Sequence, residues 1–160
     1  MIERKFPMQQ GDLDYFCSIY AVINLLHTKG QVADLSAAGV LFTKLIEAID
    51  AEDGGSVAAT ATRGVYREDV LWLLEVLGHE CSKSQKPTAR QIVEGAGKGA
   101  IVFFKAPGEQ FDHYTVVSAD ATEDRLALFD SYDFEAILRD GDRWTLNGKT
   151  VEILNLYVLG

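Results

Sequence analysis

The hydrophobic pattern of the chain changes once, near Ala100, and this change limits the fold more than any other feature. Before it, apolar residues recur every three or four positions, as they do on helices. After it, short runs rich in β-branched and aromatic residues indicate strands. Helices followed by strands, rather than alternating with them, are typical of an α+β fold. The 160 residues suit a single domain, 1–160, with a helical part over about 1–98 and a sheet part over about 99–160.

Four helices are predicted in the helical part. The first, over residues 17–27, is apolar around nearly its whole circumference and therefore belongs in the core. The second begins near Asp34 or Ser36, either of which can cap it, and ends before a loop over residues 54–64. The third is predicted over residues 67–77, and a shorter fourth helix follows a Thr88 cap.

The sheet part contains four predicted strands, over residues 100–105, 113–119, 125–130 and 151–159. Asn147-Gly148, before the last strand, is a strong hairpin signal because both residues tolerate the positive φ angles of a tight turn. A short polar turn joins the second strand to the third. These connections predict a mostly antiparallel sheet.

The acidic composition narrows the choice of partners. Twenty-four acidic residues against 15 basic ones give a formal charge of -9, which argues against nucleic acid and anionic membranes. The first residues lack the apolar stretch of a signal peptide, and no apolar run is long enough to span a bilayer. We therefore expect a cytoplasmic protein that binds neither nucleic acid nor membranes.

The two cysteines, Cys17 and Cys81, are expected to be free thiols, because a cytoplasmic chain of this length needs no disulfide. The cysteines and histidines are scattered, apart from His79 and Cys81 two positions apart, so no metal site is expected. The glycine-rich stretches lack the strand-to-helix context of a phosphate-binding loop, and no cofactor is expected. Cys81 has no predicted cap or base beside it and is interpreted as structural.

Cys17, at the start of the first helix, is the candidate nucleophile. A helix N-terminus and a nearby imidazolium both favour the reactive thiolate. His113, which opens a predicted strand, can supply the imidazole. His27 is unsuitable, because ten residues of helix place it roughly 15 Å from Cys17.

Asp130 is the candidate partner of His113. A strand that starts at His113, turns and returns would bring Asp130 beside the imidazole, where a carboxylate could fix the ring tautomer. Asp112 and Asp133 are alternatives for this role. A purely structural role for Asp130 is to cap the turn over residues 130–133.

Three segments together resemble a known family. Residues 10–24, Gln-Gly-Asp-Leu-Asp-Tyr-Phe-Cys-Ser-Ile-Tyr-Ala-Val-Ile-Asn, resemble the nucleophile region of papain-like cysteine peptidases, with the nearest likeness to the peptidase C39-like branch. Residues 112–117, Asp-His-Tyr-Thr-Val-Val, and 128–131, Leu-Phe-Asp-Ser, are similar to its histidine and aspartate segments. Two details depart from that pattern: Ser18 stands where glycine is usual, and Gln10 lies seven residues before Cys17 instead of six.

The resemblance implies a papain-like α+β fold, with N-terminal helices, the nucleophile on a central helix, and a C-terminal antiparallel sheet against which the helices pack. It also implies Cys17 as nucleophile, His113 as general base and acid, and Asp130 as the orienting group. Gln10, with Gln9 as the alternative, and the Cys17 backbone N–H would stabilise the oxyanion.

These residues predict a cysteine peptidase or a related thiol-dependent amide hydrolase that acts on a peptide, a protein or a small amide. A papain-like transferase or deamidase would use the same thioester chemistry. A non-catalytic binding module is the third possibility. The sequence leaves the oligomeric state open.

Overall fold

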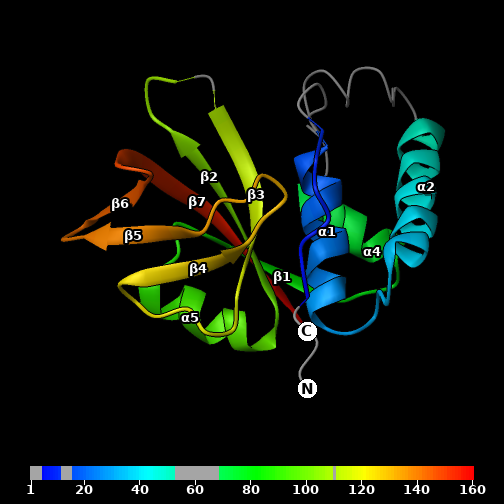
Figure 1. The fold of residues 1–160 in the computed structure, drawn as a ribbon, viewed down its shortest axis with the longest axis horizontal. Coiled ribbons are helices and arrows are strands. Elements are labelled where there is room, and N and C mark those ends of the chain that lie inside the picture. Colours follow the sequence, from blue (N-terminus) through cyan, green and yellow to red (C-terminus); the bar gives the residue numbers. More distant parts are fainter. Residues whose placement is uncertain (1–4, 12–15, 53–68, 110) are drawn as a thin grey trace.

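The computed structural model of the protein describes residues 5–11, 16–52, 69–109 and 111–160 (Figure 1). The helices in these ranges are α1 (Cys17–Thr28), α2 (Leu35–Ala51), α4 (Asp69–Val76) and α5 (Ala89–Lys98). The strands are β1 (Cys81–Gln85), β2 (Ala100–Ala106), β3 (Phe111–Val117), β4 (Arg125–Phe129), β5 (Ala136–Asp140), β6 (Arg143–Leu146) and β7 (Lys149–Leu159). No helix among the described residues is long and apolar enough to cross a membrane.

The predicted helices are confirmed, with small shifts at their ends. Asp34 is the N-cap of α2, and its side chain accepts a hydrogen bond from the Ala37 N–H. Thr88 caps α5 in a reciprocal capping box with Gln91. The loop predicted over residues 54–64 lies outside the described residues.

The predicted strands are also confirmed, as β2, β3, β4 and β7. Asn147 and Gly148 have φ angles of 51° and 79° and form the tight turn between β6 and β7. Three further strands, β1, β5 and β6, were not predicted. They are short, and β1 (Cys-Ser-Lys-Ser-Gln) has no apolar alternation that would indicate a strand.

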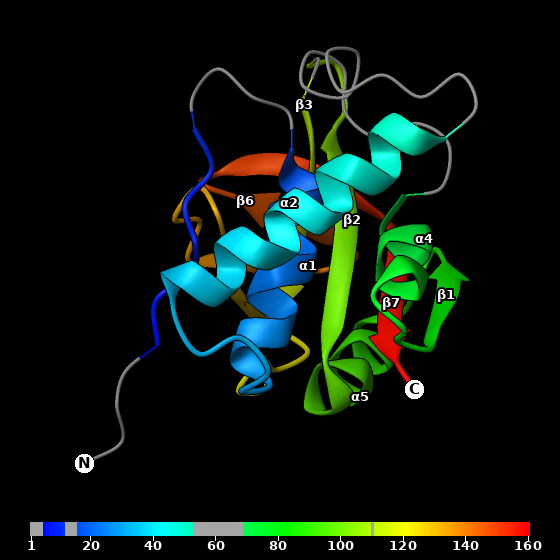
Figure 2. The same cartoon turned by 90° about the vertical axis from the view of Figure 1, so that its right-hand side faces the viewer.

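Six of the described strands close into an antiparallel barrel in the order β7-β2-β3-β4-β5-β6, and β6 pairs back onto β7. The length of β7 makes this closure possible. Its residues 149–151 pair with β6 and residues 155–159 pair with β1, while β2 occupies the opposite edge. Strand β1 therefore extends the sheet outside the barrel (Figure 2).

The papain-like α+β arrangement expected from the sequence is wrong. That arrangement places N-terminal helices against a C-terminal antiparallel sheet, whereas the sheet here closes on itself. The physical reason is the pair β5 and β6, which connects β4 to the first residues of β7 through continuous antiparallel pairing. One strand of the sheet, β1, also comes from the part of the chain before α5.

Alternate residues of β2 face two separate cores. Ile101 packs with α1, α2 and α4 outside the barrel, together with Tyr114 and Val116 of β3. Val102 and Phe104 point the other way, into the barrel interior. Figures 1 and 2 show α1 between the barrel and α2, so α1 is covered on both sides. The nearly all-apolar sequence of α1 is explained by this position.

Candidate active site

Cys17 is the first residue of α1 and is half-buried. Phe16 occupies the N-cap position, and its side chain makes no capping hydrogen bond to the first N–H groups of the helix. The helix packs directly against β3, the strand that carries His113. The fold therefore brings the predicted nucleophile and the predicted base from opposite halves of the chain to one place.

His113 lies on the barrel-facing side of β3, opposite Phe104 of β2. Strands β3 and β4 pair only at Val116–Phe129 and Val117–Leu128, so β4 does not cover the first half of β3. The chain leaves β4 at Asp130 and passes close to the His113 ring. Because β4 leaves this part of β3 unpaired, the loop after β4 and α1 can contact the ring.

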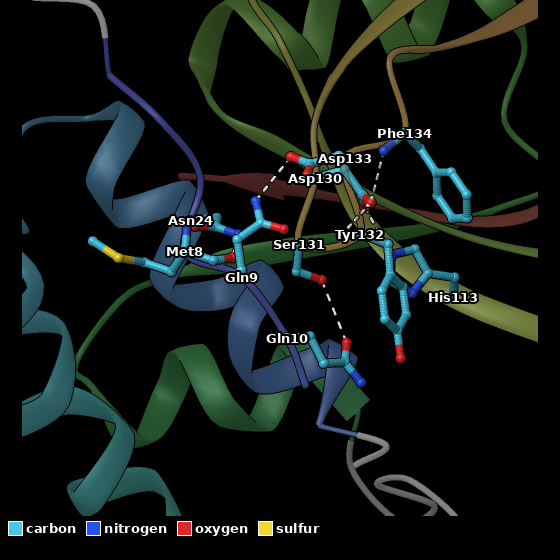
Figure 3. Close-up of polar contacts among 10 residues, drawn as sticks. All are labelled: Met8, Gln9, Gln10, Asn24, His113, Asp130, Ser131, Tyr132, Asp133 and Phe134. Carbon is cyan, nitrogen blue, oxygen red and sulfur yellow. Dashed lines mark hydrogen bonds and ion pairs between the residues drawn. The ribbon is translucent and has the colours of Figure 1, made fainter. Parts of the chain in front are cut away.

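Asp130 holds His113 and its own loop with different oxygens. Its Oδ1 lies 2.7 Å from His113 Nε2. Its Oδ2 accepts hydrogen bonds from the backbone N–H of Tyr132 (2.8 Å) and of Phe134 (3.3 Å), as Figure 3 shows. The catalytic and the turn-capping interpretations of Asp130 are thus both compatible with its contacts.

The second nitrogen of the His113 ring completes the arrangement. Nε2 is directed at Asp130, and the Cys17 side chain is close enough to the same imidazole to act on its pKa. Because Nε2 faces Asp130, Nδ1 is the ring nitrogen that can face the sulfur of Cys17. The imidazole of His113 therefore lies between the Cys17 thiol and the Asp130 carboxylate.

Burial and charge oppose each other at His113. The side chain is only 1% exposed, and burial alone would lower its pKa. The hydrogen bonds and negative charges of Asp130 and Cys17 outweigh this effect and raise the pKa of His113 to about 9. Burial alone would raise the pKa of Asp130, but the hydrogen bond and charge of His113 leave the pKa of this carboxyl below its ordinary value. The two groups therefore form an ion pair at neutral pH.

Aromatic rings enclose His113. Phe111 stacks on the imidazole with centroids 6.0 Å apart, and Tyr132 lies at 5.2 Å. Phe104 and Phe134 meet the ring edge-on at 5.8 and 5.7 Å. Sequence reasoning missed this enclosure, because its members come from β2, β3 and the loop after β4. The enclosure fixes the plane of the ring and excludes water from the His113–Asp130 pair.

Gln10 lies beside this group and is 8% exposed. Its backbone N–H donates to the Ser131 carbonyl at 3.0 Å, and the Ser131 hydroxyl donates to Gln10 Oε1 at 3.4 Å (Figure 3). Gln9 is exposed instead and donates to Asp133 Oδ1 at 2.9 Å. Of the two glutamines considered for the oxyanion site, Gln10 is therefore the one beside the residue that follows Asp130.

Asn24 fixes the segment that carries Gln10. This buried side chain accepts a hydrogen bond from the Met8 N–H at 2.6 Å and donates one to the Met8 carbonyl at 3.1 Å. The interaction is a two-point clamp between α1 and the chain before it (Figure 3). Its role was not predicted, although a lone amide in an apolar helix is a signal that a buried partner is required.

The other titratable candidates lie elsewhere. The His27 ring contacts the Val32 carbonyl at 2.6 Å near the far end of α1. Cys81 is in β1, and its Sγ lies 3.6 Å from the carbonyl of its neighbour Ser82. Asp133, an alternative partner for His113, is hydrogen-bonded to Gln9. Within the described ranges, no group of three or more histidine, cysteine or acidic side chains is arranged to hold a metal ion.

Comparison with known proteins adds no family to this description. The chain matches no protein-family model and none of the curated proteins with which it was compared. Its function must therefore be inferred from the residues and geometry of the site itself.

Proposed function

We propose that the protein is a cysteine peptidase or a related thiol-dependent amide hydrolase. The observation that carries this proposal is the chain of contacts from Asp130 through the buried His113 ring to the half-buried thiol of Cys17. A thiol, an imidazole and an orienting carboxylate in this order are the parts that nucleophilic acyl transfer requires.

In the proposed reaction, the Cys17 thiolate attacks the carbonyl carbon of an amide, and the carbonyl oxygen becomes an oxyanion. His113 then gives its proton to the leaving amine, and the C–N bond breaks to leave a thioester. A water molecule enters, His113 takes one of its protons, and the resulting hydroxide attacks the thioester. The acid product leaves, and Cys17 and His113 return to their starting state.

The electrostatics support His113 as the proton donor. Its pKa of about 9 keeps the ring protonated through neutral pH while Asp130 is ionised. An imidazolium next to the sulfur favours the thiolate and holds the proton that the leaving amine needs. Asp130 stabilises this cation and fixes the ring orientation, while the surrounding aromatic rings limit the access of water.

Gln10 is the proposed side-chain donor to the oxyanion, with the Cys17 backbone N–H as the second donor. The position of Gln10 supports this role, because its side chain is buried beside Ser131, the residue that follows Asp130. Removing one such donor typically costs about 3 kcal/mol of transition-state stabilisation.

The likeness of three segments to C39-like peptidases supports the same chemistry but not the same fold, since the barrel departs from the papain-like arrangement. One set of catalytic residues can be built on unrelated folds. Two free thiols suit a reducing compartment and support a cytoplasmic location for the activity.

The first test compares the two cysteines of the chain. Alkylation by iodoacetamide at pH 6.5, followed by mass spectrometry, should modify Cys17 about tenfold faster than Cys81, which is also half-buried. The substitution His113→Ala should remove this difference. If Cys17 reacts no faster than Cys81 in the wild-type protein, the thiol is not activated and a binding module becomes the better interpretation.

The second test measures turnover. A peptide mixture derived from a whole proteome is incubated with the wild-type protein, with Cys17→Ala and with Cys81→Ala, and new termini and free ammonia are measured. We expect new termini with the wild-type and Cys81→Ala proteins and none with Cys17→Ala. Ammonia without new termini would identify a deamidase, and equal activity of Cys17→Ala would contradict the proposal.

A further inference from the structure

One end of the barrel carries an apolar pocket of about 250 Å³ that the catalytic description does not use. It is formed by the end of β2, the start of β3, the β6–β7 hairpin and the residue Phe134 before β5. Ala106, Leu146 and Val151 form its apolar wall. At its rim, Lys149 on the β6–β7 side and Glu109 on the β2–β3 side form an ion pair at 2.9 Å.

Two rings connect this pocket to the catalytic histidine. Phe111 and Phe134 line the pocket, and both also pack on the His113 imidazole, at centroid distances of 6.0 and 5.7 Å. The two rings meet each other edge-on at 6.0 Å. The pocket is therefore one ring layer away from His113, on the barrel side and away from α1.

The protonation of the leaving amine by His113 determines which half of a substrate could reach this pocket. The general acid must contact the nitrogen of the leaving amine, so the leaving group lies on the same side of the scissile bond as His113. A peptide chain advances about 3.3 Å per residue when extended, so the first or second residue beyond the scissile bond can cross one ring layer.

We propose that this pocket binds an apolar side chain on the amine side of the scissile bond, so that the substrate is a peptide or protein with such a residue one or two positions after the cut. This inference rests on the proposed function and adds a substrate class to it. Because the ion pair of Lys149 and Glu109 leaves no net charge at the rim, the pocket favours uncharged side chains.

The test is a profile of cleavage sites. The wild-type protein and Cys17→Ala are incubated with a proteome-derived peptide mixture, and only cuts that require Cys17 are aligned. We expect leucine or phenylalanine to be favoured over alanine by about tenfold at one of the two positions after the cut. The substitution Ala106→Leu, which fills the pocket, should abolish this preference without changing the residues preferred before the cut.

Ala119→Leu provides the matched control, because Ala119 is exposed and follows the opposite end of β3. Two rim variants on exposed side chains act independently of the interior. Lys149→Ala leaves the Glu109 carboxylate unpaired and should increase cleavage before basic residues several-fold, while Glu109→Ala should do so before acidic residues. Hydrolysis of a preformed acyl-enzyme should proceed at the wild-type rate in all these variants, because the leaving group has then departed.

The two possible failures are distinguishable. Cuts that depend on Cys17 but show no apolar preference after the scissile bond, or a preference that survives both Ala106→Leu and the rim variants, would overturn the pocket assignment alone. An absence of any Cys17-dependent cut would overturn the proposed peptidase function and the pocket assignment with it.

Discussion

Asp130 combines two tasks in one side chain, because each carboxylate oxygen has its own partners. Oδ1 faces the His113 ring, and Oδ2 receives the N–H groups of Tyr132 and Phe134. Three nitrogen atoms, one from β3 and two from the loop after β4, are thereby fixed around one negative charge. The loop that carries two of the aromatic neighbours of His113 is held by the same residue that holds the imidazole.

Asp130→Asn should show what the negative charge of Asp130 contributes, because asparagine has nearly the same size and shape without the charge. An asparagine amide has one acceptor oxygen and one donor nitrogen, so it cannot replace both carboxylate oxygens as acceptors and cannot pair with a charged imidazole as Asp130 does. We expect the pKa of His113 to fall, because the carboxylate that raises it is gone. Turnover should fall about 100-fold. An NMR titration of the imidazole and a steady-state assay check both effects.

Asp133→Asn is the matched control for this change. Asp133 lies three residues later in the same loop, is exposed, and accepts a hydrogen bond from Gln9. The control should leave the titration of His113 and the turnover unchanged. A titration of His113 that is the same in Asp130→Asn and in the wild-type protein would show that the carboxylate does not set the charge of the ring.

At the scale of elements, the site depends on how the chain before α1 is attached. Met8 is clamped to Asn24 of α1, and two residues later Gln10 is bound to Ser131 after β4. This segment therefore spans from the helix that carries Cys17, the proposed nucleophile, to the loop that begins at Asp130. The position of Gln10 depends on both attachments.

Asn24→Ala should detach this segment from α1. The change removes two buried hydrogen bonds and leaves the Met8 backbone groups without them, which should lower the free energy of unfolding by about 1–3 kcal/mol. Turnover should fall as well, because the segment that carries Gln10 loses its attachment to α1 at Met8. Urea unfolding and the rate of peptide cleavage measure the two effects.

Thr88→Ala is the control for Asn24→Ala, because it should lower the stability of the protein without changing the position of Gln10. Thr88 caps α5, which Figure 1 shows at the lower end of the barrel and which packs into the barrel core, and its loss should cost about 1 kcal/mol. Turnover should stay at the wild-type level. A variant of Asn24 that loses stability but keeps full turnover would show that the clamp does not position Gln10.

The elements that the sequence predicted are those with a strong local signal. Helix α5 is marked by its Thr88 capping box, and the β6–β7 turn by Asn147-Gly148. Cys17, His113 and Asp130 were predicted as candidate catalytic residues because each stands at the start or end of a periodic segment. The strands β1, β5 and β6 were missed because they are short and are held by their neighbours rather than by their own composition.

At the scale of the whole molecule, the closure of the barrel could not be predicted from the hydrophobic pattern of any single segment. It depends on the pairing of β6 with residues 149–151 of β7, while later residues of the same strand pair with β1. A periodicity of two shows that β7 is a strand but not which strands use each part of its edge. The aromatic enclosure of His113 was missed for the same reason, since it assembles only when β2, β3 and the loop after β4 meet.

The ion pair at the centre of the site should also link the stability of the whole chain to pH. The pKa of His113 is about 9 in the folded protein and 6.5 ordinarily, so the folded state binds this proton more tightly. The resulting stabilisation is complete below pH 6.5 and is lost as the pH rises through 9. The shift corresponds to about 3 kcal/mol. At Asp130 the pKa is lowered, so its contribution is present above about pH 4 and is lost as the pH falls further.

His113→Gln isolates this effect from the general charge of the chain. Because the protein carries a net charge of -9, repulsion among its acidic groups is common to the wild-type protein and the variant. We expect the difference in unfolding free energy between them, measured with urea at pH 5.5, 7 and 9, to shrink as the pH rises. A difference that stays constant over this range would mean that His113 binds its proton no more tightly in the folded protein than in the unfolded chain. The proposal that His113 is charged at neutral pH would then have to be abandoned.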